Sequence, residues 1–414
     1  MQIRLAEFVR DTPEGQEAAE IVGRCVHCGF CAAVCPTYQL LGNELDGPRG
    51  RLYLIKQVLE GVEPTIKTQL HLDRCLTCRS CESTCPSGVQ FGRLLDIGRK
   101  LVDGKVPRSA GSRLVRGALK AGVTGPLFPV AMALGRTFRP LLPPKLQEQV
   151  PPRQDPGAWP RRSHQRRVLL LAGCVQPAMS PNVNAATARV LDAVGIETLV
   201  PSPAGCCGAI RFHLNDQDGG LADARRNIDA WWPAVEAGAE AVVMNASGCG
   251  SMVKDYGDLL RHDARYAAKA ARVSSLTRDL SELLAEHVHL LKARLAGAAG
   301  QRVAFHPPCS LQHGQRIRGA VEGLLADLGA EVLPFADSHL CCGSAGTYSL
   351  LQPALSGRLR ERKLDALMKV KPEVVLSANI GCIAHLGAAA RIPVRHWIEW
   401  LDERLPKMGT VPIS

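Results

Sequence analysis

The sequence has few aromatic residues, and it lacks the long apolar runs and glycine-rich loops that mark several large classes of protein. Phe, Trp and Tyr make up 4% of the 414 residues, and they are not interleaved with basic residues, which argues against a nucleic-acid partner. No apolar run reaches the ~20 residues that span a bilayer. No GxGxxG or GxxxxGK[ST] loop follows an apolar strand, so the chain contains no evident nucleotide or flavin site.

The first residues contain no apolar segment of the kind that directs secretion, so we expect a cytoplasmic protein in a reducing compartment. Hydrophobic residues make up 46% of the chain and charged residues 21%, which is typical of a globular protein with two or three domains. The formal net charge of +11 favours an acidic partner protein, an anionic membrane surface or a solvated basic face.

No cysteine is left outside two repeated patterns, although the chain has 16 of them. Eight lie in two runs of the form C-x2-C-x2-C-x3-C-P, which is the spacing by which bacterial ferredoxins bind [4Fe-4S] clusters. The first run contains Cys25, Cys28, Cys31 and Cys35, and the second contains Cys75, Cys78, Cys81 and Cys85.

The spacing predicts that three cysteines of each run bind one cluster and that the fourth binds the other cluster. Two alternatives are less consistent with it: zinc ribbons usually separate two C-x2-C pairs, and disulfides require an oxidising compartment. The predicted ligand sets are Cys25, Cys28, Cys31 and Cys85 for cluster 1, and Cys75, Cys78, Cys81 and Cys35 for cluster 2.

The pattern of apolar residues predicts a small, mainly helical N-terminal domain over residues 1–104. We expect a helical lead-in over 1–24 and helices over 50–60 and 91–102, held together by the metal. A basic, proline-containing connector is expected over 105–167, and its apolar segment 125–134 could pack on the next domain or lie on a membrane. Arg49, Arg51, Arg74 and Arg79 near the cluster loops could bind an acidic partner, raise the cluster potentials or be solvated.

The remaining eight cysteines mark an internal repeat that begins near residue 168. Strands are expected at 168–172, 241–245, 303–305 and 374–378, and helices over 184–194 and 319–328, which together indicate α/β units with largely parallel sheets. We therefore predict two repeated cysteine-rich domains over 168–300 and 301–414. The cysteines follow strand ends, where open α/β sheets place their sites, and the sets are Cys174, Cys206, Cys207 and Cys249, and Cys309, Cys341, Cys342 and Cys382.

Several interpretations of these repeat cysteines remain open. Each set could bind an additional iron–sulfur cluster or zinc, act as a redox dithiol, or consist of buried free cysteines at a close interface. The nearby His306, His313, His339 and His385 could supply protons if the repeats were themselves catalytic in quinone or disulfide reduction.

The Cys-Cys-Gly repeats resemble the cysteine-rich domains of heterodisulfide reductase subunits and of iron–sulfur subunits of hydroxyacid and glycerol-phosphate dehydrogenases. In the heterodisulfide reductases the pattern closes with C-x2-C, whereas here Met252 and His385 replace the last cysteine. Nearly the whole chain outside the connector resembles the family of glycolate oxidase (glycolate dehydrogenase) iron–sulfur subunits. The tracts that carry this likeness are 27–31 (HCGFC), 35–42 (CPTYQLLG), 45–51 (LDGPRGR), 73–78 (DRCLTC), 227–233 (NIDAWWP), 246–249 (ASGC), 339–348 (HLCCGSAGTY) and 394–398 (VRHWI).

This resemblance implies an electron-transfer subunit of an enzyme complex that carries two [4Fe-4S] clusters. A partner subunit with FAD would oxidise glycolate to glyoxylate, and electrons would pass through this chain towards quinone. A lactate or glycerol-3-phosphate dehydrogenase subunit is the alternative within the same group. We expect a cytoplasmic location with peripheral contact to the inner face of the membrane.

Overall fold

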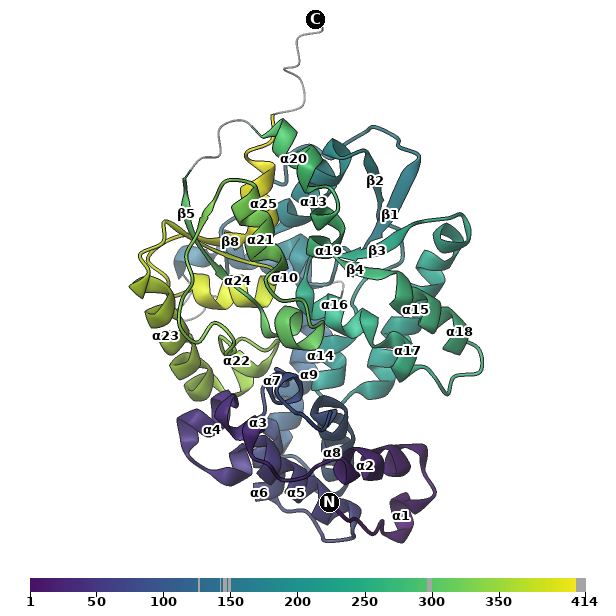
Figure 1. Ribbon diagram of the computed structural model, residues 1–414. Coiled ribbons are helices and arrows are strands. Elements are labelled where there is room, and N and C mark those ends of the chain that lie inside the picture. The colour runs from purple at the N-terminus through teal and green to yellow at the C-terminus, as the bar shows by residue number, and fades with distance from the viewer. Residues whose placement is uncertain (126, 142, 144–146, 148–149, 296–299, 407–414) are drawn as a thin grey trace, which may run out of the picture.

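The protein consists of a helical N-terminal domain beneath two α/β repeats that lie side by side (Figure 1). The computed structural model describes residues 1–414 except 126, 142, 144–146, 148–149, 296–299 and 407–414. The mixed α/β class, with a helical N-terminal domain and two repeats that each contain a parallel sheet, is as expected from the sequence. The domain limits at 104, 167 and 300 stay predictions.

The N-terminal domain is built only from helices and loops, and the three helical regions expected in it are present. Helix α8 packs its apolar face against α5, and together they bury Leu52, Ile55, Leu94 and Leu95. The N-terminal elements are α1 (Glu7–Arg10), α2 (Pro13–Gly23), α3 (Phe30–Ala33), α4 (Pro36–Leu41), η1 (Glu44–Asp46), α5 (Pro48–Leu59), α6 (Ile66–Asp73), α7 (Ser80–Ser83) and α8 (Phe91–Lys105).

A buried acid joins the elements between the two cysteine runs. Asp46 is fully buried and lies 3.0 Å from the ring nitrogen Nδ1 of His71, 3.0 Å from Arg74 and 3.5 Å from Arg51. Arg51, also buried, donates hydrogen bonds to the His71 carbonyl and to the Thr37 hydroxyl. Because these residues come from α4, η1, α5, α6 and the loop after α6, the network holds the two halves of the domain together.

The connector contains α9 (Ala110–Thr124), α10 (Phe128–Thr137) and η2 (Arg139–Leu141). The apolar segment expected at 125–134 is mostly helical, with residue 126 outside the described part of the chain, and α10 buries Met132 while Val130 and Leu134 stay exposed. No single described helix is long and apolar enough to cross a membrane; α9 and α10 pass that test only as a pair, with a bend of 92° between them.

Two arginines at the start of the connector pair with acids of the N-terminal domain. Arg108 contacts Asp73 at 2.6 Å and Asp103 at 2.7 Å, and Arg116 contacts Asp73 at 3.0 Å. These partly buried ion pairs hold the pKa of Asp73 below its usual value, because the arginine charges outweigh the effect of its burial. The start of the connector is therefore held against the N-terminal domain by ion pairs and is not an unattached basic segment.

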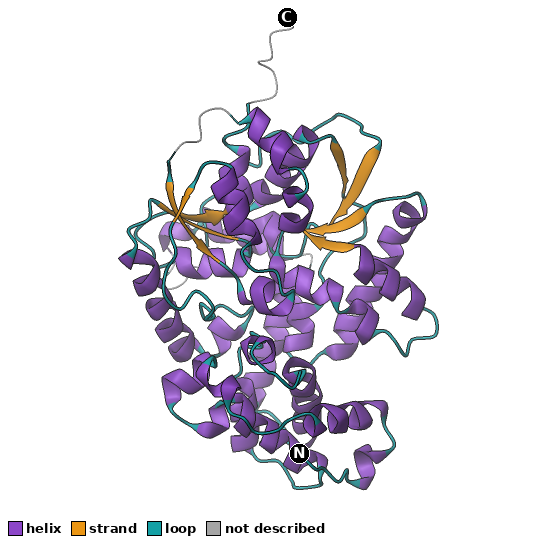
Figure 2. Ribbon diagram, in the orientation of Figure 1, coloured by secondary structure: helices purple, strands orange, loops and turns teal. Residues whose placement is uncertain are grey.

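Each repeat contains one four-stranded parallel sheet flanked by helices (Figure 2). The strand orders are equivalent, β2-β1-β3-β4 in the first repeat and β6-β5-β7-β8 in the second. The expected strands are all present, within one or two residues of their predicted ends. The strands are β1 (Arg166–Leu170), β2 (Ile196–Leu199), β3 (Ala241–Met244), β4 (Thr277–Asp279), β5 (Arg302–His306), β6 (Glu331–Val332), β7 (Val374–Ser377) and β8 (Val394–His396).

The helices of the repeats include the two expected from the sequence, α13 and α21. In the first repeat they are α12 (Gln176–Met179), α13 (Pro181–Ala193), α14 (Ala209–His213), α15 (Gln217–Glu236), α16 (Ser247–Lys254), α17 (Tyr256–Leu259), α18 (Ala267–Leu276), α19 (Leu280–Ala285) and α20 (Val288–Arg294). In the second they are η3 (Ser310–Gly314), α21 (Ala320–Asp327), α22 (Tyr348–Leu351), α23 (Pro353–Lys369), α24 (Ile380–Gly387) and α25 (Trp397–Asp402).

The two repeats share one hydrophobic core, which runs from Val168 of the first sheet to Trp397 and Trp400 of the second repeat. Polar contacts cross the same interface: the Asn245 carbonyl lies 2.7 Å from the ring nitrogen Nε2 of His396, and the backbone N–H of Ser247 donates to the Ala378 carbonyl. The repeats therefore form one packed unit.

The buried Asp46 network gives a prediction about stability. The Asp46→Ala substitution leaves two arginines without their buried partner, so we expect it to lower the free energy of unfolding by about 3–5 kcal/mol. Unfolding of the metal-loaded chain by denaturant without oxygen measures this. The matched control is Glu44→Ala, which removes the half-exposed pair with Arg49 and should cost less than about 1 kcal/mol. Equal losses would contradict a structural role for Asp46.

Candidate functional site

Four thiols from both cysteine runs line one cavity of the N-terminal domain. Cys25 and Cys28 lie in the loop after α2 and Cys31 lies in α3, while Cys85 follows α7. All four line the cavity, and Arg49 and Phe91 complete part of its wall. The structure thus brings together the residues predicted to bind cluster 1.

A second, adjoining cavity is lined by Cys75, Cys78 and Cys81 together with Cys35 of the first run. These are the residues predicted to bind cluster 2. Cys81 and Phe91 line both cavities, so the two sites share a wall. That Cys85 binds cluster 1 and Cys35 binds cluster 2 stays a prediction. The grouping of the thiols in the two cavities supports this prediction.

The same unusual backbone conformation turns the cysteines inward in both loops. His27 and Gly29 in the first loop, and Thr77 and Arg79 in the second, all have φ between 52° and 86°. This left-handed region suits glycine but is uncommon for other residues. Arg79 adopts it while its guanidinium contacts Asp255 of the first repeat at 2.6 Å, so the loop is also fixed from outside.

The burial of these thiols makes their ionisation costly in the absence of a metal. Burial together with the neighbouring thiolates of Cys25, Cys28 and Cys85 raises the pKa of Cys31 to about 11. The pKa values of Cys78 and Cys81 are raised for the same reasons. Thiolates are the form that binds iron, and bound cations offset their repulsion. Eight thiols line the two cavities, with Cys81 in both, which fits two cubane clusters with four thiolate ligands each.

Four arginines near the cluster loops pair with acids of this chain. Arg51 and Arg74 contact Asp46. Arg49 lies 2.6 Å from Glu44, and Arg79 lies 2.6 Å from Asp255. An acidic partner for these arginines stays a prediction, and any such partner would compete with these pairs.

The second cluster loop packs against the second repeat. Leu76 and Cys78 belong to the same apolar cluster as Cys309, Cys341 and Tyr348. The Tyr348 hydroxyl donates to the Arg74 carbonyl at 3.2 Å. The thiolate of Cys309 also contributes to the raised pKa of Cys78. The cavity lined by Cys78 and the thiols of the second repeat are thus neighbours.

The first repeat gathers its four cysteines, as their positions after strand ends predicted. Hydrogen bonds from the thiols of Cys174 and Cys207 lower the pKa of Cys206, helped by the Gly208 N–H and by Arg211. The Cys207 thiol in turn interacts with Cys249. This arrangement favours one thiolate among three thiols when no metal is bound.

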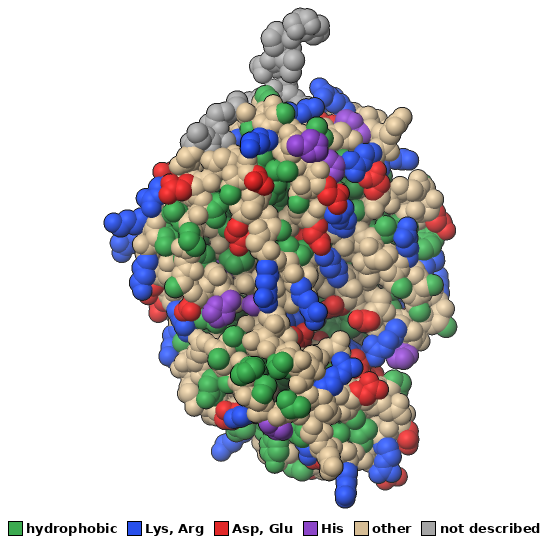
Figure 3. Space-filling view, in the orientation of Figure 1, with side chains coloured by type: hydrophobic (Ala, Val, Ile, Leu, Met, Phe, Trp, Pro, Cys, Tyr) green, Lys and Arg blue, Asp and Glu red, His purple; other side chains and the backbone are tan. Residues whose placement is uncertain are grey.

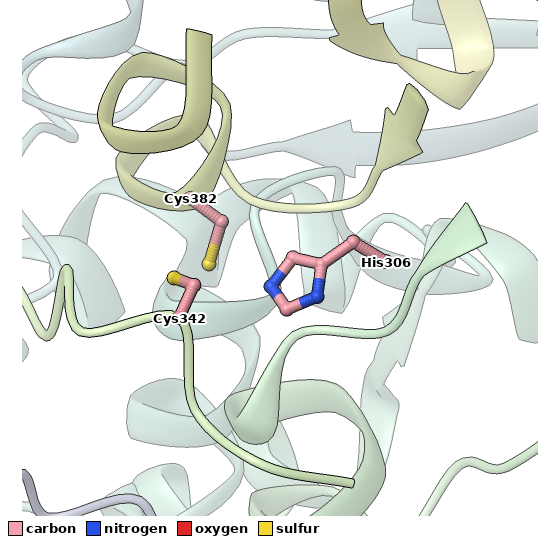
Figure 4. Close-up of side chains that lie close together, drawn as sticks. All are labelled: His306, Cys342 and Cys382. Atoms are coloured by element: carbon pink, nitrogen blue, oxygen red, sulfur yellow. The ribbon is translucent and has the colours of Figure 1, made fainter. Parts of the chain in front are cut away.

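The second repeat gathers its four cysteines in the same way but adds a histidine. The sulfur atoms of Cys309 and Cys341 lie 3.9 Å apart. Cys342 interacts with Cys341 and with Cys382. His306 extends from the end of β5 towards Cys342 and Cys382 (Figure 4), and the ligand atoms of these three residues lie within 4.8 Å of one another.

The sequence interpretation treated His306 as a possible proton donor and missed it as a possible ligand. The sequence repeat contained a signal for this role. The offset between the copies places Leu171 of the first repeat at the position of His306, so only the second repeat has a histidine there. His313 and His385 instead form hydrogen bonds, with Ser83 and Ser356 respectively, and burial lowers the pKa of each to about 4. Both are therefore neutral near pH 7.

The helices that carry Cys249 and Cys382 lie at the interface between the repeats. The Gly248 N–H of α16 donates to the side-chain oxygen of Asn379, which precedes α24. Cys341, in the Cys-Cys-Gly turn of the second repeat, instead packs with Leu76 and Cys78 of the N-terminal domain. Met252, at the position of the missing cysteine of the first repeat, is buried in its apolar core.

The grouping of the thiols predicts which substitutions remove the same cluster. Cys28→Ser and Cys85→Ser should abolish one electron paramagnetic resonance signal, whereas Cys78→Ser and Cys35→Ser should abolish the other. In each case iron should fall from about eight to about four per chain. If Cys35→Ser removed the same signal as Cys28→Ser, each run would bind its own cluster and the exchange would be wrong.

Comparison with protein-family models matches all three parts of the chain that carry cysteines. Residues 21–89 match the model of a 4Fe-4S dicluster domain. Residues 168–254 and 303–387 each match a cysteine-rich domain. The N-terminal domain is thus of the iron–sulfur type, and the repeats are two copies of one domain.

Similar proteins cover the chain almost from end to end. It is 54% identical over 410 residues to the glycolate oxidase iron–sulfur subunit of Escherichia coli (strain K12), an alignment that covers 98% of this chain and 100% of that protein. It is 30% identical over 415 residues to a probable glycolate oxidase iron–sulfur subunit of Bacillus subtilis (strain 168), covering 92% of each. Lactate utilization protein A of Geobacillus thermodenitrificans (strain NG80-2) is 28% identical over 248 residues, which are 58% of this chain and 99% of that protein. This chain belongs to the family of glycolate oxidase iron–sulfur subunits.

Proposed function

We propose that this chain relays electrons inside a glycolate-oxidising complex, from a flavoprotein partner that converts glycolate to glyoxylate towards quinone. The observation that carries the proposal is the pair of adjoining thiol-lined cavities with Cys81 in their common wall. Clusters bound by these thiols would supply one-electron carriers in close sequence. The residues of the chain hold, separate and shield these carriers.

The first cavity is the better entry point for electrons, because its loop is open to a partner. Cys28 is exposed, and its neighbours Val26 and Phe30 are 68% and 60% exposed. Apolar side chains gather on this face of the N-terminal domain (Figure 3). Small exposed apolar patches of this kind suit the transient interfaces of electron-transfer partners.

The second cavity is more enclosed and faces the repeats. Cys78 packs among Leu76, Tyr348 and Cys341, and Cys35 is buried. Electrons that enter near Cys28 would therefore leave from the junction between the N-terminal domain and the second repeat. The flavin belongs to a partner, since the sequence shows no nucleotide-binding loop.

Glycolate is favoured over lactate as the substrate of the complex. Identity is 54% to a protein named for glycolate and 28%, over part of the chain, to one named for lactate utilization. The substrate would bind in the flavoprotein, so this chain takes part in specificity only through its choice of partner.

The relay is tested in the assembled complex with two electron acceptors. Cys28→Ser and Cys78→Ser should each reduce glycolate-dependent reduction of a quinone analogue to background, because the electron path is interrupted. Reduction of a dye that takes electrons directly from the flavin should change less than twofold. Loss of both activities with an intact complex would contradict the relay and favour a structural role for the clusters.

A second variant in the same assay tests the entry point. Phe30→Ser leaves every thiol in place, so the iron content should not change. The concentration of flavoprotein needed for half-maximal quinone reduction should rise severalfold. Leu350→Ser, which alters a 43% exposed leucine of the second repeat, is the matched control and should have no effect. Equal behaviour of the two variants would place the partner elsewhere.

We also propose that the chain is cytoplasmic and contacts the membrane through α10 and η2. Leu127, Val130, Leu134 and Leu141 expose more than half of their surface, and Arg139 beside them is exposed. An apolar face bordered by arginines suits the surface of an anionic bilayer.

Sedimentation with lipid vesicles tests the membrane contact. The unmodified chain should bind vesicles with anionic lipid more strongly than neutral ones, and added salt should weaken binding. The double variant Val130→Ser/Leu134→Ser should lose most of the bound fraction, whereas Leu350→Ser should bind normally. Binding that is equal in all three proteins would contradict this contact.

A further inference from the structure

His306 is a buried histidine without a hydrogen-bond partner. It is 1% exposed, and neither of its ring nitrogens forms a hydrogen bond. The other buried histidines in the described part of the chain all have partners: His71 contacts Asp46, His287 the Leu283 carbonyl, His313 Ser83, and His396 the Asn245 carbonyl. A buried polar group without a partner is costly, so His306 requires an explanation that the other histidines do not.

The neighbours of His306 are suitable metal ligands. A ring nitrogen of His306 and the sulfur atoms of Cys342 and Cys382 lie within 4.8 Å of one another, and all three residues are buried. Figure 4 shows the imidazole and the two thiols converging from separate segments. His306 ends β5, Cys342 lies in the loop after β6, and Cys382 lies in the first turn of α24. Separate segments of the fold therefore meet at one point.

We propose that the second repeat binds a single zinc ion through His306, Cys342 and Cys382. Zinc is tetrahedral and accepts imidazole nitrogen and thiolate sulfur in the same site. Two thiolates balance its charge of 2+, which a buried site requires. The ion would also satisfy a nitrogen of His306 that has no partner in the protein.

Cys341 is the best candidate for the fourth ligand. It is adjacent to Cys342, and the Gly343 N–H donates to its sulfur at 3.4 Å. A third thiolate would add a negative charge, and the buried Lys363 interacts with Cys341, Cys342 and Cys382 as a compensating cation. Lys363 is itself held by the carbonyls of Asp337 and Ser338.

Other contacts orient the ligands. The Ser377 hydroxyl donates to the His306 carbonyl at 2.9 Å, which fixes the end of β5. The Asn379 amide donates to the Cys382 sulfur at 3.6 Å. Partners of this kind around the ligands are typical of metal sites.

The first repeat cannot form the same site, although its fold is equivalent. Leu171, buried at 3% exposure, stands at the position of His306, so that repeat offers sulfur ligands only. The zinc site would fix the loop that carries Cys341 against Cys78 and Leu76 of the second cluster cavity. Because zinc has no redox chemistry, its role would be structural, and the second repeat would not extend the relay.

Metal analysis of the full chain, purified without oxygen, tests the site. We expect about one zinc per chain beside the iron of the N-terminal domain. His306→Leu, which introduces the residue of the first repeat, should lose the zinc and keep the iron. His385→Gln is the matched control, since His385 is a partly buried histidine of the same repeat that forms a hydrogen bond with Ser356. This variant should keep both metals.

Zinc that is absent from the unmodified chain, with no uptake of added Zn²⁺ or Co²⁺, would overturn the proposal. Zinc retained in His306→Leu would overturn the assignment of His306. If that variant does not fold, X-ray absorption at the zinc edge of the unmodified protein decides, because one nitrogen in the first shell supports the site and sulfur alone refutes it. Iron in excess of about eight per chain, lost in Cys382→Ser, would show a cluster in place of zinc. None of these readouts depends on glycolate oxidation.

Discussion

The arrangement of the N-terminal domain depends on charge repulsion among the thiolates that line its two cavities. Eight cysteine side chains line two adjoining cavities, and burial together with neighbouring thiolates raises the pKa values of Cys31, Cys78 and Cys81. Four thiolates can share such a cavity only when cations offset their charge. Metal bound by these thiols would add to the hydrophobic core and the Asp46 network in holding the two loops, so metal binding and folding are linked in this domain.

The two repeats show how one fold serves two different sites. Their sheets have equivalent strand orders, and their cysteines reach the carboxyl ends of the strands in both copies. The first repeat surrounds its thiols with Leu171 and Met252, whereas the second places His306 and the buried Lys363 near them. The nitrogen donor of His306, which the first copy lacks, changes which metal the thiols can bind, although the strand order is the same.

The contact between the N-terminal domain and the repeats makes the two cluster sites differ in exposure. Cys28 and its apolar neighbours are exposed at one end of the pair of cavities, and Cys78 is packed against the second repeat at the other. Arg79, in a left-handed backbone conformation, fixes the second loop to Asp255 of the first repeat. The repeats therefore cover one cluster site and leave the other accessible.

The sequence alone determined the local features, because they depend on spacing along the chain. The spacing of the cysteines predicted which thiols share a cavity. Apolar periodicity predicted α5 and α8, and short apolar runs predicted two strands of each sheet, β1, β3, β5 and β7, but not β2, β4, β6 and β8. The register between the copies also predicted two equivalent sheets. Each of these follows from a few neighbouring residues, whose conformations are set mainly by local sterics and by the burial of one face.

The tertiary structure decided every feature that depends on side chains distant in the chain. Arg74 pairs with Asp46, and Arg79 pairs with Asp255, which composition could not reveal because a net charge does not say which charges meet. The packing of Cys78 against Cys341 and the convergence of His306 with Cys342 and Cys382 likewise arise only when separate strands and loops are brought together. The spacing of cysteines specifies the ligands that one loop supplies. The packing of sheets and helices specifies the sites to which several separate segments contribute ligands.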